Sequence, residues 1–431
     1  MIPLSIEKIG AVTGGIVTLP AGDDSVLVID RITEGLRYVA DNDLYCCPIT
    51  DLLSAQKAMI LARLRGAAAT LSEAPPYSNK LPHIQVPDYM AAIRSLARTS
   101  RERFSGTVIA VTGSCGKTTT KELLYAMLRR SAPCTASPES SNALSAIPNN
   151  LLAVRESDRF AVLEAGIVRT GEMEQISAIL RPDVGIVTNI GAAHLEGLGS
   201  VENVLAEKLK IFEHSPSGFA AFLNGDDSLL QTVTDIRGVK PHFFRASDWR
   251  GELPFAGEHF RTDVAAAAAV ARFLGVPEEE IEAAVRDFTP PEERCQFITV
   301  GDCTVINDCF NANPVSMRSA LELLSTCPGR RIAVLGDMPE LGESAAEYHR
   351  QIGAFAAEKK PDTLVCIGEL AEHIALGAVG AGYPKENCFC YSSADAFLAE
   401  EHPFPAGSTV LLKASHGMCF HRILENLTEK I

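Results

Sequence analysis

Short apolar runs alternate with helical periodicity from about residue 105 onward. The run Thr107–Val111 is rich in β-branched residues, as in a strand buried on both faces, and Phe160–Leu163 and Val184–Thr188 repeat that character. A glycine-containing loop follows the first run, and the pattern then predicts a helix over Thr118–Arg130. Strands that alternate with helices in this way predict a doubly wound parallel sheet.

The last third of the chain carries a second set of such runs. The strands it predicts are Thr304–Ile306, Arg331–Leu335, Thr363–Ile367 and Thr409–Leu412, with helical patterns between them. This order predicts another α/β unit, of Rossmann-like pattern. Between the two sets, the alanine-rich segment Ala265–Ala271 predicts a closely packed helix.

The first hundred residues are less regular. Their pattern predicts a helix at Ser54–Arg65, a loop at Pro75-Pro76 and a second helix at Tyr89–Arg101 that leads into the next block. A chain of 431 residues is long enough for two or three cores. We therefore expect an α/β protein of three domains, over residues 1–104, 105–297 and 298–431.

Composition and charge narrow the classes of function. The chain carries 39 basic and 54 acidic residues, for a formal net charge of −15, which argues against a nucleic-acid partner. No apolar run approaches the roughly 20 residues that span a bilayer, and the N-terminal residues do not resemble a signal peptide. The 12 cysteines form no C-x-x-C, as expected for free thiols in a reducing compartment. We expect a cytoplasmic protein, without membrane insertion, that acts as a monomer.

The most informative local pattern is V-T-G-S-C-G-K-T-T-T at residues 111–120, between a predicted strand and a predicted helix. Glycines 113 and 116 permit a tight turn that brings backbone N–H groups close to phosphate. Lys117 supplies a positive charge for the terminal phosphates, and Thr118 supplies a hydroxyl for Mg²⁺. The pattern predicts an ATP site formed by Thr112, Gly113, Ser114, Cys115, Gly116, Lys117, Thr118 and Thr119.

This loop departs from the general G-x-x-x-x-G-K form, because Val111 stands at its first glycine. The version T-G-S-x-G-K-T-T-T resembles the Mur ligases and the related folylpolyglutamate synthases. Further segments match the Mur ligases in the same order: V-L-E-A-G at 162–166, T-N-I-G-A-A-H-L at 188–195 and N-D-C-F-N-A-N-P-V-S-M at 307–317. The segment L-G-D-M-P-E-L-G-E at 335–343 resembles the branch of the family that adds D-alanyl-D-alanine.

The resemblance implies three domains with a central P-loop sheet, and an ATP-dependent ligase that activates a carboxylate as an acyl phosphate. It implies that D-alanyl-D-alanine is joined to a UDP-N-acetylmuramoyl tripeptide in peptidoglycan precursor synthesis. Residues 1–104 would then bind the UDP-linked substrate, and residues 298–431 the incoming amine. The catalytic set it implies is Lys117, Glu164, His194 and Lys208.

The resemblance also assigns ligands. Two Mg²⁺ ions would be held by Thr118, Glu164, His194 and Lys208, with Lys208 carbamylated. Beyond the phosphate loop, the nucleotide would contact His259, Arg294, Asp308 and Asn311. The candidate contacts to the other substrates are Arg37, Asn142, Asn313, His349, Lys413, Ser415 and His416.

Several segments depart from the branch pattern. Its D-S-R reads Gly35-Leu36-Arg37, its N-x-N-N reads S-S-N-A at 140–143, and its adenine-side H-N-x-x-N reads H-F-R-T-D at 259–263. Phosphate and metal groups are kept, whereas substrate-side groups are altered. Two alternatives therefore stay open: a Mur-type ligase for another carboxylate and amine, such as a specialised metabolite or a glutamyl chain, and a non-catalytic nucleotide-binding scaffold.

Overall fold

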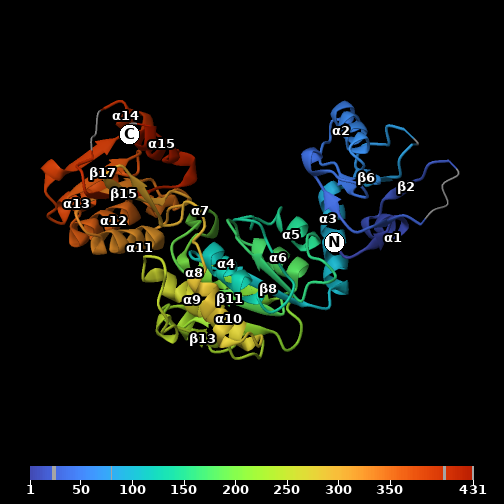
Figure 1. The fold of residues 1–431 in the computed structure, drawn as a ribbon, viewed down its shortest axis with the longest axis horizontal. Coiled ribbons are helices and arrows are strands. Elements are labelled where there is room, and N and C mark those ends of the chain that lie inside the picture. Colours follow the sequence, from blue (N-terminus) through green and yellow to red (C-terminus); the bar gives the residue numbers. More distant parts are fainter. Residues whose placement is uncertain (22–25, 79, 401–403, 430–431) are drawn as a thin grey trace.

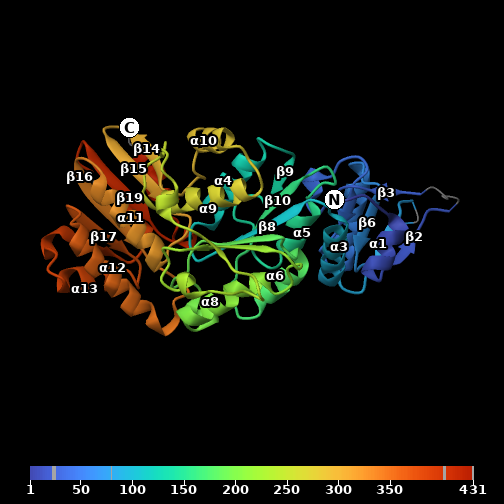
Figure 2. The ribbon, with the colours of Figure 1, turned by 90° about the horizontal axis from the view of Figure 1, so that it is seen from below.

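The computed structural model describes residues 1–21, 26–78, 80–400 and 404–429. Three α/β lobes follow one another along the long axis of the molecule, with the N-terminal and C-terminal lobes at opposite ends (Figure 1). Figure 2 shows the same row turned by 90°. Each lobe is built on a sheet that is largely or wholly parallel, so the predicted fold class is confirmed.

The N-terminal lobe contains a five-stranded sheet of order β2-β7-β6-β5-β4, in which only the β2–β7 pair is antiparallel, and a two-stranded β1–β3 ladder. Its strands are β1 (Leu4–Ser5), β2 (Ile16–Thr18), β3 (Val28–Ile29), β4 (Ile32–Thr33), β5 (Leu44–Cys46), β6 (Ala69–Ser72) and β7 (His83–Gln85). Its helices are α1 (Ile6–Thr13), α2 (Leu52–Leu64) and α3 (Tyr89–Arg103). Both predicted helices are present, and α2 begins two residues early because Asp51 caps it by accepting a hydrogen bond from the Ser54 amide.

Helix α3 joins this lobe to the next. The Arg101 side chain donates to the carbonyl of Leu180 and to the carboxylate of Asp183, each at 2.8 Å. The same Asp183 carboxylate accepts from the amide of Val108 in the following strand. These bonds fix the direction in which the chain enters the central sheet.

The central lobe contains a fully parallel six-stranded sheet of order β13-β12-β11-β8-β10-β9. Its strands are β8 (Thr107–Thr112), β9 (Cys134–Ala136), β10 (Phe160–Glu164), β11 (Val184–Val187), β12 (Ala220–Asn224) and β13 (His242–Phe244). Its helices are α4 (Lys117–Leu128), α5 (Ile147–Leu152), α6 (Glu172–Leu180), α7 (Leu195–Leu198), α8 (Val201–Leu209), α9 (His259–Phe273) and α10 (Glu278–Arg286). The alanine run lies in α9, which packs closely against α4 because small side chains let the two helices approach.

The order of the central strands positions the site. Strand β8 lies between β10 and β11, with Val111 opposite Glu164 and Thr112 opposite Val187. The carboxyl ends of these three strands therefore meet at one edge of the sheet, where ligands bind in open α/β sheets.

The C-terminal lobe contains a six-stranded sheet of order β14-β15-β19-β16-β17-β18, with β14 antiparallel to its neighbour. Its strands are β14 (Gln296–Val300), β15 (Cys303–Asp308), β16 (Arg330–Gly336), β17 (Thr363–Ile367), β18 (Cys388–Tyr391) and β19 (Ser408–Lys413). Its helices are α11 (Pro314–Thr326), α12 (Ala345–Lys359), α13 (Glu372–Gly380), α14 (Ala394–Leu398) and α15 (His421–Glu429). Asp308 and Lys413 are register partners at the ends of β15 and β19. Within the described part of the chain, no helix has the length and apolar character needed to cross a membrane.

Candidate active site

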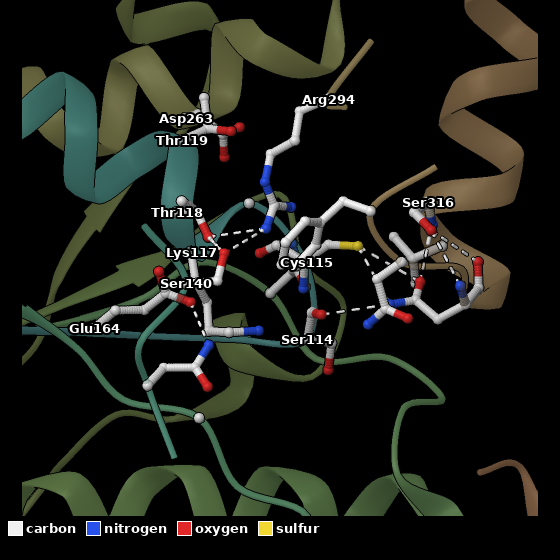
Figure 3. A pocket seen from close by; sticks show the side chains of 18 of the residues that line it. Ser114, Cys115, Lys117, Thr118, Thr119, Ser140, Glu164, Asp263, Arg294 and Ser316 are labelled. Atoms are coloured by element: carbon white, nitrogen blue, oxygen red, sulfur yellow. Dashed lines mark hydrogen bonds between the residues drawn. The ribbon is translucent and has the colours of Figure 1, made fainter. Parts of the chain in front are cut away.

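A cleft of about 610 Å³ lies between the central and C-terminal lobes. The phosphate loop forms one of its walls (Figure 3). Residues from the ends of β15 and β19 line it as well. The predicted site residues that line it are Ser114, Cys115, Gly116, Lys117, Thr118, Thr119, Asn142, Glu164, His194, His259, Arg294, Asp308, Asn311, Asn313 and Lys413. The fold therefore brings together side chains that are up to about 300 residues apart in the sequence.

The phosphate loop depends on its two glycines. Gly116, with φ of 75°, precedes α4, and a Cβ built on it would lie 2.3 Å from Oδ1 of Asp263. A Cβ on Gly113 would lie 1.9 Å from Oγ1 of Thr188. Both the backbone conformation and the lack of space therefore require glycine here. The Cys115 amide donates to Oδ1 of Asn189 at 2.8 Å, which fixes the middle of the loop.

Two lysines converge behind this loop. Nζ of Lys117 and Nζ of Lys208 donate to the same carbonyl, that of Gly113, at 3.0 and 2.9 Å. Burial, opposed in part by the charge of Glu164, lowers the pKa of Lys117. Burial and the charge of Lys117 hold the pKa of Lys208 well below that of an ordinary lysine. Burial therefore favours the neutral amine form of Lys208.

Glu164, at the end of β10, presents a free carboxylate oxygen to the cleft. Its Oε1 accepts from Nδ2 of Asn142 at 2.6 Å, whereas its buried Oε2 has no hydrogen-bond partner among the described residues. The residue is only 1% exposed. An unpaired buried carboxylate oxygen is costly unless a cation or donor meets it. Glu164 and the nearby hydroxyl of Thr118 therefore fit a first Mg²⁺, an ion that keeps several waters and uses phosphate oxygens as further ligands.

The structure supplies fewer ligands for the second predicted Mg²⁺ than for the first. His194, in the left-handed conformation with φ of 55°, pairs through Nδ1 with Glu340 of the C-terminal lobe. Burial lowers the pKa of His194 even though Glu340 opposes the shift. No three His, Cys, Asp or Glu side chains converge as metal ligands within the described ranges. An ammonium group on Lys208 would repel a cation beside His194, whereas an anionic form of Lys208 would supply a further ligand.

Arg294 reaches into the cleft from the segment that connects α10 with β14. Its guanidinium donates to Oγ1 of Thr118 and to Oγ of Ser140, each at 3.0 Å, as Figure 3 shows. The same group lies 4.2 Å from the centroid of the Phe310 ring, a cation–π arrangement. Arg294 therefore links the phosphate loop to the C-terminal lobe.

The C-terminal wall of the cleft is held by an ion pair. Nζ of Lys413 lies 2.8 Å from Oδ2 of Asp308 and donates to the carbonyl of Asn311 at 2.6 Å. Asn313 caps helix α11 by accepting from the amide of Ser316, and its side chain also contacts Cys115 of the phosphate loop. These contacts join the two walls directly.

Two groups near α9 have strongly shifted pKa values. Burial lowers the pKa of His259 to about 4, so its ring is neutral near pH 7. Burial raises the pKa of Asp263 to about 8, against the opposing effects of a hydrogen bond from Thr120 and the charge of Arg294. Both side chains line the cleft.

Some predicted residues lie elsewhere. Arg37 is in the N-terminal lobe, where its guanidinium lies 4.6 Å from the ring centroid of Tyr38. His349 is fully buried in α12, with its ring bonded to the Met338 amide and the Ala345 carbonyl, so it holds a loop and does not reach the cleft. Ser415 and His416 lie just beyond Lys413, outside the cleft lining. The expectation that His349 faces the incoming amine therefore has no support in this geometry.

Other residues of the site were missed. Ser140, Asn189, Asp263 and Phe310 line the cleft and were not predicted to contact ligands. All four lie inside or beside segments that match the Mur ligase pattern or depart from it. The sequence marked these segments, but it gave no indication of which side chain in each would point inward.

Comparison with known proteins agrees with this geometry. Residues 111–249 match the Mur ligase middle domain, and residues 293–416 match the Mur ligase, glutamate ligase domain. The UDP-N-acetylmuramoyl-tripeptide–D-alanyl-D-alanine ligase of Treponema pallidum is 31% identical over 374 residues, 80% of either chain. That of Bacillus subtilis is 28% identical over 466 aligned positions, which cover 100% of this chain and 99% of the relative.

The chain belongs to the Mur ligase family. Among solved structures, a crystal structure of MurF from Acinetobacter baumannii matches this Mur ligase with a TM-score of 0.85 and 26% identity over 99% of both chains. MurF from Thermotoga maritima in complex with ADP matches with a TM-score of 0.77 and 25% identity, over 93% of this chain and 97% of that one.

Proposed function

We propose that this Mur ligase uses ATP to join D-alanyl-D-alanine to a UDP-N-acetylmuramoyl tripeptide, through an acyl phosphate, in peptidoglycan precursor synthesis. One observation carries the proposal. A single cleft joins the phosphate loop, the unpaired oxygen of Glu164 and the Asp308–Lys413 pair of the opposite wall. Curated relatives that match the chain over its whole length bear the name of this activity.

The phosphate side of the cleft would receive ATP. Loop amides and the start of α4 favour anions, and Lys117 places its amino group beside them. Thr118 and Glu164 would hold Mg²⁺, which would neutralise charge on the transferred phosphoryl group when bound. Arg294, which donates a hydrogen bond to Thr118, would bind the terminal phosphate.

Lys208 is suited to carbamylation. The nitrogen of a neutral amine attacks CO₂, forms a new C–N bond and loses one proton, which gives an anionic carbamate. Starting from the ammonium form, two protons are released in all. The lowered pKa of Lys208 makes the neutral amine available. Together with His194, the carbamate would provide the ligands of a second Mg²⁺.

The lobes would divide the substrates. We assign the UDP-linked tripeptide to residues 1–104, with Arg37 as a candidate contact, and ATP to residues 105–297. The incoming D-alanyl-D-alanine would bind on the side of residues 298–431. Asn313 and Lys413 belong to the cleft wall on that side, and Asn142 lies beside Glu164. We further propose that the enzyme acts in the cytoplasm as a monomer.

An assay of phosphate release tests the proposal. Release should require ATP, Mg²⁺, the UDP-tripeptide and D-alanyl-D-alanine together, and Lys117→Met should abolish it. Lys240→Met, at an exposed position, is the matched control and should keep wild-type activity. Release with other acid–amine pairs only would favour a ligase of different specificity. ATP binding without turnover would favour a non-catalytic scaffold.

A further inference from the structure

Lys121 is a fully buried lysine on α4 that does not line the cleft. Its Nζ donates to the carbonyls of Ser137 and Glu139, each at 2.7 Å, and lies 2.6 Å from Oε1 of Glu122. An ammonium group has three N–H donors, so these three acceptors satisfy it. Burying an ammonium group is costly without such partners, and two of them are backbone carbonyls of one short segment.

That segment, residues 137–140, follows β9 and has an unusual backbone. Glu139 has a φ of 42°, in the left-handed region that non-glycine residues rarely adopt. Such a conformation persists only where surrounding contacts hold it. The two bonds from Lys121 fall on the strained residue itself and on the residue at the start of the segment.

The same segment contacts the cleft through its side chains. Oγ of Ser137 accepts from the amide of Glu164 at 3.0 Å. Oγ of Ser140 lies 3.2 Å from Oγ1 of Thr118 and accepts from Arg294 at 3.0 Å. Glu164, Thr118 and Arg294, which would hold Mg²⁺ and the terminal phosphate, therefore all bond to residues 137–140, and Lys121 holds the backbone of this segment.

We infer that Lys121 is a positioning residue for the metal and phosphate side of the cleft. It acts through residues 137–140, which set the backbone of Glu164 and the hydroxyl of Thr118, and it does not itself touch a ligand. The inference rests on the proposed function, because it presumes that ATP and Mg²⁺ bind beside these two side chains.

The test compares Lys121→Met, which removes the positive charge, with Lys121→Arg, which keeps it, and with Leu124→Ala. Leu124 is also fully buried on α4, so its truncation controls for a general loss of stability. Binding of ADP is measured by calorimetry with and without Mg²⁺, and hydrogen exchange is followed at residues 137–141. We expect Lys121→Met to raise the Mg²⁺ concentration needed for half-maximal ADP binding by about 10–100-fold, as loss of outer contacts to metal ligands does.

Binding of ADP without Mg²⁺ should change much less in this variant, exchange at residues 137–141 should become faster, and Lys121→Arg should recover part of the metal affinity. Leu124→Ala should lower the Tm and leave the Mg²⁺ midpoint unchanged. If Lys121→Met fails to fold, Lys121→Gln, which keeps two N–H donors, provides the same measurement.

The inference is overturned if a folded Lys121 variant without the charge keeps the wild-type Mg²⁺ midpoint. It is also overturned if Leu124→Ala shifts that midpoint as strongly as Lys121→Met does. A wild-type protein that binds no ADP would instead contradict the proposed function, so the two failures are distinguishable.

Discussion

Asp263→Asn is a change whose effect on stability should depend strongly on pH. The side chain of Asp263 lies behind the phosphate loop, with the residue 6% exposed, and its Oδ1 accepts from Oγ1 of Thr120 at 3.2 Å. Arg294 is the charged group that favours its ionised form, yet burial still raises the pKa from 3.8 to about 8. Asparagine has nearly the same shape, keeps an oxygen for Thr120 and carries no charge.

The size of the effect follows from the two pKa values. Because the pKa of Asp263 is raised in the folded state, its contribution to stability is fully present below about pH 4. The contribution is lost progressively as the pH rises from about 4 to about 8. A difference of about 4 pKa units at 1.36 kcal/mol each gives about 5 kcal/mol as an upper limit above pH 8. We therefore expect Asp263→Asn to be more stable than wild type by up to about 4 kcal/mol near pH 7, with the gain vanishing near pH 4.

Urea unfolding at several pH values measures this difference. The single tryptophan, Trp249, is buried in the central lobe beside the core that contains α9, so its fluorescence reports on the lobe that holds Asp263. Asp302→Asn, at an exposed position, controls for the loss of one negative charge. The reasoning would be refuted if the difference in unfolding free energy between wild type and Asp263→Asn did not change between about pH 4 and pH 9.

Three further outcomes test the site. Glu164→Gln keeps the bond with Asn142 but loses the negative charge. Mg²⁺-dependent phosphate release should therefore fall by about 10–100-fold, while binding of ADP without Mg²⁺ persists. Activity equal to that of the wild type would contradict the assignment of Glu164 as a metal ligand. Removal of dissolved CO₂ should inactivate the wild type and added bicarbonate should restore it, whereas Lys208→Ala should be inactive in both; rescue of that variant by bicarbonate would count against carbamylation. His349→Leu should lower the unfolding free energy, measured in thermal melts, by about 1–3 kcal/mol, because it leaves the Met338 amide unpaired. The KM for D-alanyl-D-alanine should stay unchanged. A raised KM would show that His349 lies on the substrate side of the cleft.

Local pattern was enough for the framework of the central and C-terminal lobes. The β-branched run that forms β8 and the periodic segment that forms α4 were predicted within two residues of their observed ends. Buried parallel strands and their helices are encoded by neighbouring residues, so a short window contains most of the signal. The strands of the N-terminal lobe have only two to four residues each, too few to show a period, and they were not predicted.

The phosphate loop could likewise be identified without a structure. Its glycines, lysine and threonines are consecutive, and their chemistry depends on the strand before them and the helix after them. The sequence by itself therefore determined where phosphate should bind and which class of fold surrounds it.

Only the tertiary structure decided which distant side chains share the cleft. Arg294 meets Thr118 across 176 positions, and Asp263 lies against the loop from a helix that begins 143 residues after Gly116. His349 and Lys413 were both predicted on the amine side of the cleft, yet the ring of His349 bonds within its own lobe while Lys413 lines the cleft. Such outcomes depend on strand order and on how the lobes pack, because a side chain's direction and burial are set by neighbours that no local window contains.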